Sequence, residues 1–515
     1  MAQIYNKYDS DLLQSNIEYI LKDVKRLRDE KIEPYISEVK AIHKICLDFF
    51  TGLKRKIYGG LALHLLIKEK DPLVKLYDED DIVDIDVYSY TPIDDLIELC
   101  NLLHDKGFKY VRAREAVHRE TYTIYVNGKS YVDITYVPKN IFAKMPFKTI
   151  DGITTIHPYF MMIDFLRITT DPFSYWRLFD QSKKAFERMS LLEKYHPLPY
   201  NALSISTSVK PENLSILNFL INYIADNNLI CVGLYTYNLF LVKAKNSSKS
   251  KFTNTDTIEL RKFKYIDPIN YEIISDNYKE DAIKLIEILK EKYGDQITYK
   301  EYSPYFQFIG NSVNIYYNEN LVCTIYDNNK RCIPYNKVKD PVINKEIHIG
   351  TFSLVLMYIV IKIMWSRILN DDEMRIFNHQ FASNLIEIRN IYYNLNPRAN
   401  ILSNDIFSDF KTQIRGIPLL PERERLVLGE ERKKKNKAFM FSYDPVDGKL
   451  LTEEEITKIK TFIFQNSSGN PIIHKKCSIL YPEVIDLIAK AKSDPDLDLS
   501  EIPKTIEEKN EEKNE

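Results

Sequence analysis

The sequence predicts an α+β protein in which a mixed sheet with flanking helices is followed by a second unit of similar design. Helical stretches alternate with short β-branched runs over residues 54–156, and the same order of elements returns between about residues 214 and 338. The chain is also 515 residues long. That exceeds the size that one hydrophobic core usually serves, so we expect two or three domains.

The first fifty residues are expected to form two helices. Apolar side chains between Leu12 and Leu27 recur at helical spacing after Ser10, which we take as the N-cap. Pro34 is expected to begin the second helix, because proline is favoured in the first helical turn. A short strand from Lys54 then ends at a Gly-Gly pair, and residues 61–70 have a helical pattern.

The next segment, DIVDIDVYSY at residues 81–90, alternates in polarity and predicts a strand. Thr91 and Pro92 are expected to cap and begin a helix. Asn-Gly at 127–128 joins two alternating runs and predicts a hairpin, and Asp-Gly at 151–152 predicts another. Further helices are expected over residues 158–195, 348–400 and 450–492.

The repeated order of elements in residues 214–338 suggests an internal duplication. In our alignment, glycines match and the acidic positions of the first copy fall on other residues of the second: Gly60 on Gly233, Asp84 on Asn270, Asp86 on Glu272 and Asp133 on Asn314. The second copy would then keep the scaffold and lack the carboxylates. The alternative is that any two α+β units look alike when only their patterns are compared.

Composition excludes several classes of protein. The net charge is −2, so the chain does not coat nucleic acid by bulk electrostatics. Its six cysteines form no C-x-x-C pair, which indicates reduced thiols without structural zinc. The N-terminus lacks a signal-peptide layout. The most apolar run, residues 354–361, falls short of the ~20 residues that cross a bilayer, so we expect a buried core helix.

Three aspartates carry the expected chemistry. Asp84 and Asp86 are two apart on a strand and therefore point to the same face, with Ile85 and Val87 turned to the core. Asp133 lies on a second strand of the same alternation and would complete a cluster of three carboxylates. Such a cluster is what two-metal phosphoryl transfer requires, and hard oxygen ligands favour Mg²⁺ or Mn²⁺.

A Gly-Gly pair, Gly59-Gly60, stands at the strand-to-helix turn, where backbone N–H groups could approach phosphates. Each signal alone has an ordinary explanation. The D-x-D pair lies near the acidic residues 78–81 and could belong to a solvated turn, and Asp133 could be a polar residue at a strand end. The order strand, Gly-Gly, helix, D-x-D strand, helix and hairpin with Asp is far more specific.

Four segments carry a family resemblance: YGGLALH, DIDVYS, SYVDITYVPKNIF and ITTDPFSYWRLFDQSKKAFERMSLLEKY. They resemble the nucleotidyltransferase superfamily typified by DNA polymerase beta, and more narrowly the poxvirus-type poly(A) polymerase catalytic subunit carried by giant DNA viruses. The resemblance implies a nucleotidyltransferase fold, ATP as nucleotide, a metal trio at Asp84, Asp86 and Asp133, and mRNA 3′ ends as acceptor. It also implies action in the host cytoplasm, in viral factories, and packaging in virions.

The patterns along the chain, together with the resemblance, predict five segments. They are an N-terminal helical region (1–53), a catalytic nucleotidyltransferase domain (54–200), a degenerate nucleotidyltransferase-like domain with helices (201–400), a C-terminal extension (401–500) and a disordered tail (501–515). One departure concerns the residue after the second glycine. Many members of the superfamily have Ser or Thr there, with a hydroxyl that touches a phosphate, and this chain has Leu61.

Further nucleotide-binding candidates are weaker. Lys183 and Lys184 could neutralise the triphosphate, although a solvated helix face is the better explanation, since long cations usually stay exposed. Tyr175 could stack on adenine or belong to the core. The segments 243–264, with seven cations, and 431–439 could line an RNA groove or could be loops that charge keeps soluble.

We therefore expect a poly(A) polymerase that adds AMP from ATP to RNA 3′ ends and releases pyrophosphate. One alternative is a nucleotidyltransferase with another NTP or acceptor, and another is a non-enzymatic RNA-binding scaffold. The modest charge suggests that a homodimer or a processivity subunit helps to enclose RNA. Neither membrane nor DNA is an expected partner.

Overall fold

The computed structural model describes residues 4–448 with short gaps. The gaps are residues 75, 78–82, 119, 138, 172–174, 200–204, 206, 249–254, 303–307, 329–330, 404, 410–411, 418–420 and 435–440. The helices expected over residues 450–492 and the tail lie outside the described residues, as do the acidic positions 78–81.

Two N-terminal helices precede the first sheet. The helix α1 (Lys7–Ser15) begins after Asn6, which forms a reciprocal capping box with Asp9. The predicted N-cap at Ser10 is therefore wrong, because the Asn6 pair already satisfies the first amide groups. The helix α2 (Ile17–Gly52) then runs unbroken for 36 residues. A new start at Pro34 is also wrong, since proline removes one helical hydrogen bond without necessarily ending a long helix.

The first sheet contains eight strands in the order β16-β3-β4-β5-β2-β1-β7-β6. Both predicted hairpins are present, with left-handed backbone at Asn127, Gly128, Asp151 and Gly152. The elements from β1 to β7 are β1 (Lys56–Tyr58), α3 (Gly59–Lys70), β2 (Ile85–Ser89), α4 (Pro92–Asp105), β3 (Arg112–Glu115), β4 (Thr121–Val126), β5 (Lys129–Tyr136), α5 (Lys139–Lys144), β6 (Phe147–Ile150) and β7 (Ile153–Ile156).

The second sheet repeats this architecture, in the order β10-β11-β12-β9-β8-β14-β13-β15. Seven strands of the first sheet, β3 to β6 in the order given, correspond one to one to the strands from β10 to β13 in the second. Each corresponding pair of neighbours is parallel in both sheets or antiparallel in both. The elements are α8 (Leu214–Asp226), β8 (Ile230–Cys231), α9 (Leu234–Ser248), α10 (Thr255–Lys262), β9 (Tyr271–Ser275), α11 (Tyr278–Tyr293), β10 (Ile297–Tyr302), β11 (Ser312–Tyr317), β12 (Asn320–Asp327), β13 (Ile333–Lys339) and β14 (Glu346–Gly350). The duplication inferred from the sequence is present in the topology.

The register corrects the alignment of the two copies. Asp86 is the partner of Asp133, whereas Glu272 is the partner of Thr324, so Thr324 is the equivalent of Asp133. Asn314 lies on β11, the neighbouring strand of the hairpin. A comparison of patterns could not separate the two strands, because both alternate in the same way.

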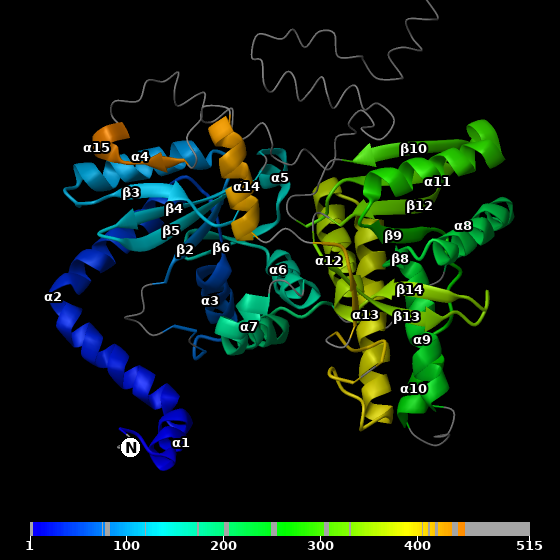
Figure 1. Cartoon of the computed structure of the whole chain (residues 1–515), viewed down its shortest axis with the longest axis horizontal. Coiled ribbons are helices and arrows are strands. Elements are labelled where there is room, and N and C mark those ends of the chain that lie inside the picture. Colours follow the sequence, from blue (N-terminus) through cyan, green and yellow to red (C-terminus); the bar gives the residue numbers. More distant parts are fainter. Residues whose placement is uncertain are drawn as a thin grey trace, which may run out of the picture.

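Helices that follow each sheet join the two copies. α6 (Pro158–Thr170) packs against α12 (Phe352–Leu369) between the sheets, with α7 (Tyr175–Tyr195) and α13 (Asp372–Leu395) beside them (Figure 1). The C-terminal segment contributes β15 (Gln413–Arg415) to the second sheet and β16 (Ser442–Tyr443) to the first, with α14 (Pro421–Lys434) between them and α15 (Pro445–Gly448) last.

The helix α12 is the one segment of the described residues that is long and apolar enough to cross a membrane, and 78% of its window is buried inside the protein. It is the expected core helix, although it is longer than the apolar run predicted. Lys362 does not end it, because its ammonium pairs with the buried Glu272.

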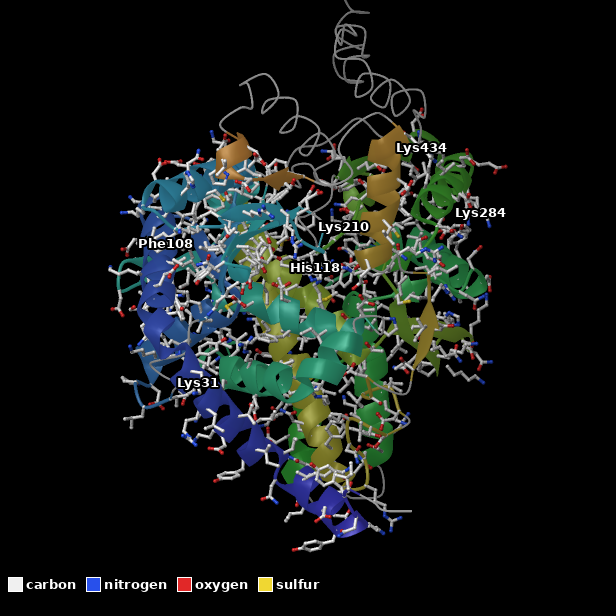
Figure 2. All side chains as sticks on the ribbon, turned by 60° about the vertical axis from the view of Figure 1, so that its left-hand side comes forward. Lys31, Phe108, His118, Lys210, Lys284 and Lys434 are labelled. Atoms are coloured by element: carbon white, nitrogen blue, oxygen red, sulfur yellow. The ribbon has the colours of Figure 1, made fainter. Side chains whose placement is uncertain are left out.

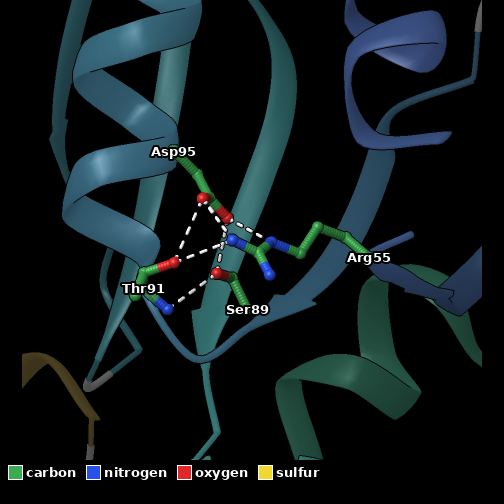
Figure 3. Close-up of polar contacts among 4 residues, drawn as sticks. All are labelled: Arg55, Ser89, Thr91 and Asp95. Atoms are coloured by element: carbon green, nitrogen blue, oxygen red, sulfur yellow. Dashed lines mark hydrogen bonds and ion pairs between the residues drawn. The ribbon is translucent and has the colours of Figure 1, made fainter. Parts of the chain in front are cut away.

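A buried ion pair joins Arg55, just before β1, to Asp95 in the first turn of α4. The Arg55 guanidinium donates to both oxygens of Asp95, at 2.7 Å and 2.6 Å. Ser89 and Thr91 complete the network, with Ser89 Oγ 2.5 Å from the same carboxylate (Figure 3). The start of β1 and the end of β2 are therefore both held against α4.

Candidate active site

Asp86 and Asp133 lie side by side on one face of the first sheet. β2 and β5 are parallel neighbours, and these two residues are direct partners in the register. The residues that flank them point to the opposite face and are buried in the core: Ile85, Val87, Val132 and Ile134. The alternation in each strand thus places two carboxylates together on the half-buried face.

Thr123 orients one of these carboxylates. Its hydroxyl on β4 donates to Asp133 Oδ1 at 2.6 Å, and the two residues are partners across the β4–β5 hairpin. Thr123 is itself buried. Its hydroxyl therefore fixes the direction in which Asp133 faces Asp86.

Asp84 immediately precedes β2 and is exposed. His43 Nε2, on α2, lies 2.9 Å from the carbonyl oxygen of Val83, so α2 holds the residue before Asp84. Within the described part of the chain, no three His, Cys, Asp or Glu side chains are placed together closely enough to hold a metal ion. The structure therefore brings together Asp86 and Asp133 as neighbours in the register, and Asp84 lies near enough for its charge to raise the pKa of both.

The carboxylate pair is electrostatically unfavourable by itself. Burial, and then the charges of Asp133 and Asp84, raise the pKa of the Asp86 carboxyl to about 8. Burial and the Asp84 charge also raise the pKa of Asp133, against the Thr123 hydrogen bond. A divalent cation between the two groups would remove this repulsion, and carboxylate oxygens are suitable ligands for Mg²⁺ or Mn²⁺. The residues present fit such an ion.

The Gly-Gly turn lies directly against this pair. Gly59 has φ +70°, and a Cβ at this position would overlap the Asp86 carboxylate. The backbone N–H of Gly60, in the first turn of α3, donates to Asp86. Only glycine allows the helix N-terminus to approach the carboxylate this closely. The turn predicted to approach phosphates thus borders the place where they would meet the carboxylates.

Aromatic side chains lie beside the carboxylates on the same face of the sheet. The rings of Tyr58 and Tyr88 stack with centroids 4.0 Å apart, and the Tyr58 hydroxyl lies 2.8 Å from Thr135 Oγ1. Phe160 of α6 contacts Tyr88 and also Phe308 of the second copy, at centroid distances of 6.0 Å and 4.6 Å. These ring contacts link Tyr58 and Tyr88, beside the carboxylates, to the second copy.

Sequence reasoning missed two residues at the site. Tyr77 places its hydroxyl against Gly60, and Arg188 of α7 donates to that hydroxyl. Tyr175, Lys183 and Lys184 were the expected nucleotide contacts on α7, but their side chains lie outside the described residues. No local signal marks Tyr77 or Arg188, because the fold brings them together from positions 111 residues apart.

The second copy lacks the carboxylate pair. Its acidic residue Glu272 receives a hydrogen bond from Tyr326 at 2.9 Å and pairs with Lys362, while Thr324 occupies the place of Asp133. Gly233 borders Glu272 as Gly59 borders Asp86, because a Cβ there would overlap the carboxylate. The glycine alignment from sequence was therefore wrong by one residue. A fixed ammonium neutralises the acidic residue in this copy.

Adjacent carboxylates on parallel strands, beside a strand–Gly-Gly–helix turn in a sheet of this order, define a protein of the nucleotidyltransferase fold. The comparisons with known proteins narrow this class. The family model described as "Poly(A) polymerase catalytic subunit" matches residues 44–175. A second, described as "APMV, Putative poly(A) polymerase, catalytic subunit, C-terminal", matches residues 213–481.

Similar proteins come from large DNA viruses. A "Putative poly(A) polymerase catalytic subunit" of Acanthamoeba polyphaga mimivirus is 32% identical, over 92% of this chain and 84% of that protein. A protein of the same description from African swine fever virus (isolate Pig/Kenya/KEN-50/1950) is 30% identical over 33% of this chain and 36% of its own length. The crystal structure of the Megavirus polyadenylate synthase has a TM-score of 0.79 and 30% identity, covering 92% of this chain and 94% of the other.

The chain therefore belongs to the poly(A) polymerase catalytic subunit family, and its enzyme class is polynucleotide adenylyltransferase.

Proposed function

We propose that this chain transfers AMP from ATP to RNA 3′ ends, releasing pyrophosphate, with Asp84, Asp86 and Asp133 as ligands of two Mg²⁺ or Mn²⁺ ions. The pairing of Asp86 with Asp133 on parallel strands beside the Gly-Gly turn is the observation that carries this proposal. The family membership supports it, since relatives are described as poly(A) polymerases.

The residues of the chain would bind and orient the reactants. Divalent cations held by the carboxylates would neutralise the triphosphate and favour ionisation of the RNA 3′-hydroxyl. Asp86 and Asp133 are oriented for this task by the Gly60 amide and the Thr123 hydroxyl. The N-terminus of α3 adds partial positive charge toward the phosphates. Asp84 would join by turning its exposed side chain toward the pair.

Elongation of labelled oligo(A) tests the proposal, with each NTP supplied in turn and Mg²⁺ or Mn²⁺ present. We expect metal-dependent extension with ATP and little with the other three nucleotides. Extension with a different NTP, or transfer to an acceptor other than RNA, would favour another nucleotidyltransferase activity. Binding of RNA with no extension and no binding of Mn²⁺ or ATP would favour a non-enzymatic scaffold.

The Thr123 hydroxyl gives a prediction about metal binding. Thr123→Val keeps the shape of the side chain and removes the donor to Asp133, so we expect Mn²⁺ to bind about 10- to 100-fold more weakly. Titration followed by electron paramagnetic resonance measures this directly. Thr123→Ser keeps the hydroxyl and should bind Mn²⁺ like the wild type. Equal affinity in the valine variant would show that the hydrogen bond does not orient a ligand.

We also propose that the N-terminal arm, residues 4–27, joins two copies of the chain. In Figure 1 the arm (α1 and the start of α2) stands clear of the body, and Figure 2 shows it continuing from Lys31 toward the N-terminus. Tyr8 and Tyr19 are each 72% exposed, and Leu21 is 60% exposed. The arm carries four cations and four anions. This balance allows it to pair with itself, while the apolar side chains provide the driving force.

Deletion of residues 1–27 tests the arm. We expect a dimer for the full chain and a monomer for the deletion variant by size-exclusion chromatography with light scattering. A monomeric full chain, or a deletion variant that stays dimeric, would contradict the proposal. Binding of a different protein to the arm would instead favour a separate processivity subunit.

The domain bounds 54–200 and 201–400 are proposed as the two units of the duplication, with the segment after residue 400 bridging them. Strands β15 and β16 support this bridging role, since they extend the second and first sheets respectively. We propose that the enzyme acts in the cytoplasm of an infected host cell. The five cysteines of the described residues support a reducing compartment, since all of them are free and buried.

A further inference from the structure

Position 61 cannot provide a hydroxyl to the site. Leu61 follows the Gly-Gly pair and packs its side chain in the core, where it is 8% exposed. A phosphate that approaches the turn would therefore meet backbone N–H groups and no side-chain hydroxyl from this segment. If the turn binds a triphosphate, its side-chain donors must come from elsewhere in the chain.

A hydroxyl from another segment lies at this turn. Tyr77 Oη sits so close to Gly60 that a Cβ at position 60 would overlap it. The Tyr77 ring also lies 5.7 Å from the ring of His64 on α3, which fixes its position along the helix. Tyr77 thus presents a hydroxyl at the beginning of α3, beside Gly60, the residue whose amide contacts Asp86.

A cation accompanies this hydroxyl. Arg188 Nη2 donates to Tyr77 Oη and would lie 3.0 Å from a Cβ at Gly60. Its positive charge acts on Asp86, whose pKa it lowers against the larger effects of burial and neighbouring carboxylates. In the part of the chain that the structure describes, Arg188 forms no ion pair with a carboxylate, and its contacts are with Tyr77. The guanidinium therefore retains donors for an anion.

The helix that carries Arg188 is anchored at its C-terminal end to α3. His196 Nε2 lies 3.2 Å from the Leu66 carbonyl oxygen, and the Tyr195 hydroxyl donates to Asp71 at 2.8 Å. These contacts hold α7 along α3, so Arg188 is positioned over the Gly-Gly turn by the fold. A long cation that is merely solvated would need no such support.

We propose that Arg188 and the Tyr77 hydroxyl, which meet at Gly60, bind the β- and γ-phosphates of the nucleotide. This inference rests on the proposed function and adds the residues that recognise a triphosphate. Arg188 supplies charge-assisted donors that suit phosphate oxygens. Tyr77 supplies a hydroxyl beside Gly60, where the backbone amides of the turn would also meet a phosphate. In the absence of nucleotide the two groups satisfy each other.

Binding measurements on the full chain test the inference. The probes are a non-hydrolysable ATP analogue, inorganic triphosphate and AMP, titrated by calorimetry. Arg188→Gln should weaken binding of the analogue and of triphosphate about tenfold or more, and Tyr77→Phe about tenfold. Neither variant should change AMP binding by more than about twofold, because AMP lacks the β- and γ-phosphates.

A matched control separates local binding from the overall charge. Lys194 is exposed on the same helix, so Lys194→Gln removes the same charge from α7 and should leave all three affinities unchanged. Thermal unfolding of each variant shows whether it is folded, and Arg188→Lys provides a second variant at this position. We expect Arg188→Lys to bind triphosphate better than Arg188→Gln, since it keeps the charge.

Three results would overturn the inference: unchanged triphosphate binding in Arg188→Gln, equal losses for AMP and triphosphate, or tighter binding in Tyr77→Phe. The last would show that the hydroxyl competes with the nucleotide. These outcomes leave the proposed function intact if the wild type binds ATP and extends RNA. A wild type that does neither would refute the proposed function itself.

Discussion

Replacing Asp86 by asparagine should lower kcat for AMP transfer by about 10³-fold or more, equivalent to about 4 kcal/mol of barrier. The side chain keeps its size and loses the negative charge that the proposed metals require. Asp86 is the carboxylate most enclosed by other site groups, with Asp133 opposite and Gly59 and Gly60 against it. Single-turnover extension of oligo(A) measures the loss.

The same variant is expected to remain folded. In the metal-free chain the substitution removes one of two neighbouring half-buried carboxylates, so the unfolding temperature should equal or exceed that of the wild type. Asp84→Ala should lose activity to a similar extent. The duplication offers a matched control for Asp84→Ala, because Asn270 is the equivalent of Asp84 in the second copy. We expect Asn270→Ala to retain RNA extension. Near wild-type activity of Asp86→Asn would refute the site assignment.

Asp95→Ala is expected to destabilise the first unit by about 3–5 kcal/mol. It leaves the Arg55 guanidinium buried without its partner, because Asp95 accepts both of its short hydrogen bonds (Figure 3). It also removes the acceptor for Ser89 at the end of β2. Urea unfolding, followed by far-UV circular dichroism, measures the change in the free energy of unfolding.

The second copy again supplies the control. Ser275 donates to Asp281 at 2.5 Å, and the Asn277 amide donates to Ser275, which reproduces the arrangement of Ser89, Thr91 and Asp95. Among the described residues Asp281 forms no ion pair, so Asp281→Ala should cost only about 1 kcal/mol. Equal effects of the two substitutions would show that the ion pair with Arg55 adds nothing to the serine hydrogen bond that both sites share.

Much of the fold follows from local signals. A two-residue hairpin turn needs left-handed backbone, which Asn127-Gly128 and Asp151-Gly152 adopt readily, and each pair closes the hairpin that was predicted there. The alternation around Asp86 and Asp133 determines which side chains leave the core, so their common face could be predicted. That the two strands are neighbours rested on the order of elements and on the resemblance.

Other features depend on contacts that no local pattern records. Arg188 and Tyr77 meet only because α7 folds back along α3. That Gly59, and not Gly60, is the equivalent of Gly233 follows from the strand pairing and from the approach of each glycine to its acidic neighbour. The prediction that a helix begins at Pro34 failed because α2 continues through this residue. A single missing hydrogen bond weakens a long helix without ending it.

Anomalous diffraction from crystals grown with Mn²⁺ and a non-hydrolysable ATP analogue tests the central claim most directly. We expect manganese peaks between the carboxylates of Asp86 and Asp133, with the Asp84 side chain turned to join them. Manganese bound elsewhere on the chain, with those two carboxylates free of metal and of nucleotide, would contradict the account.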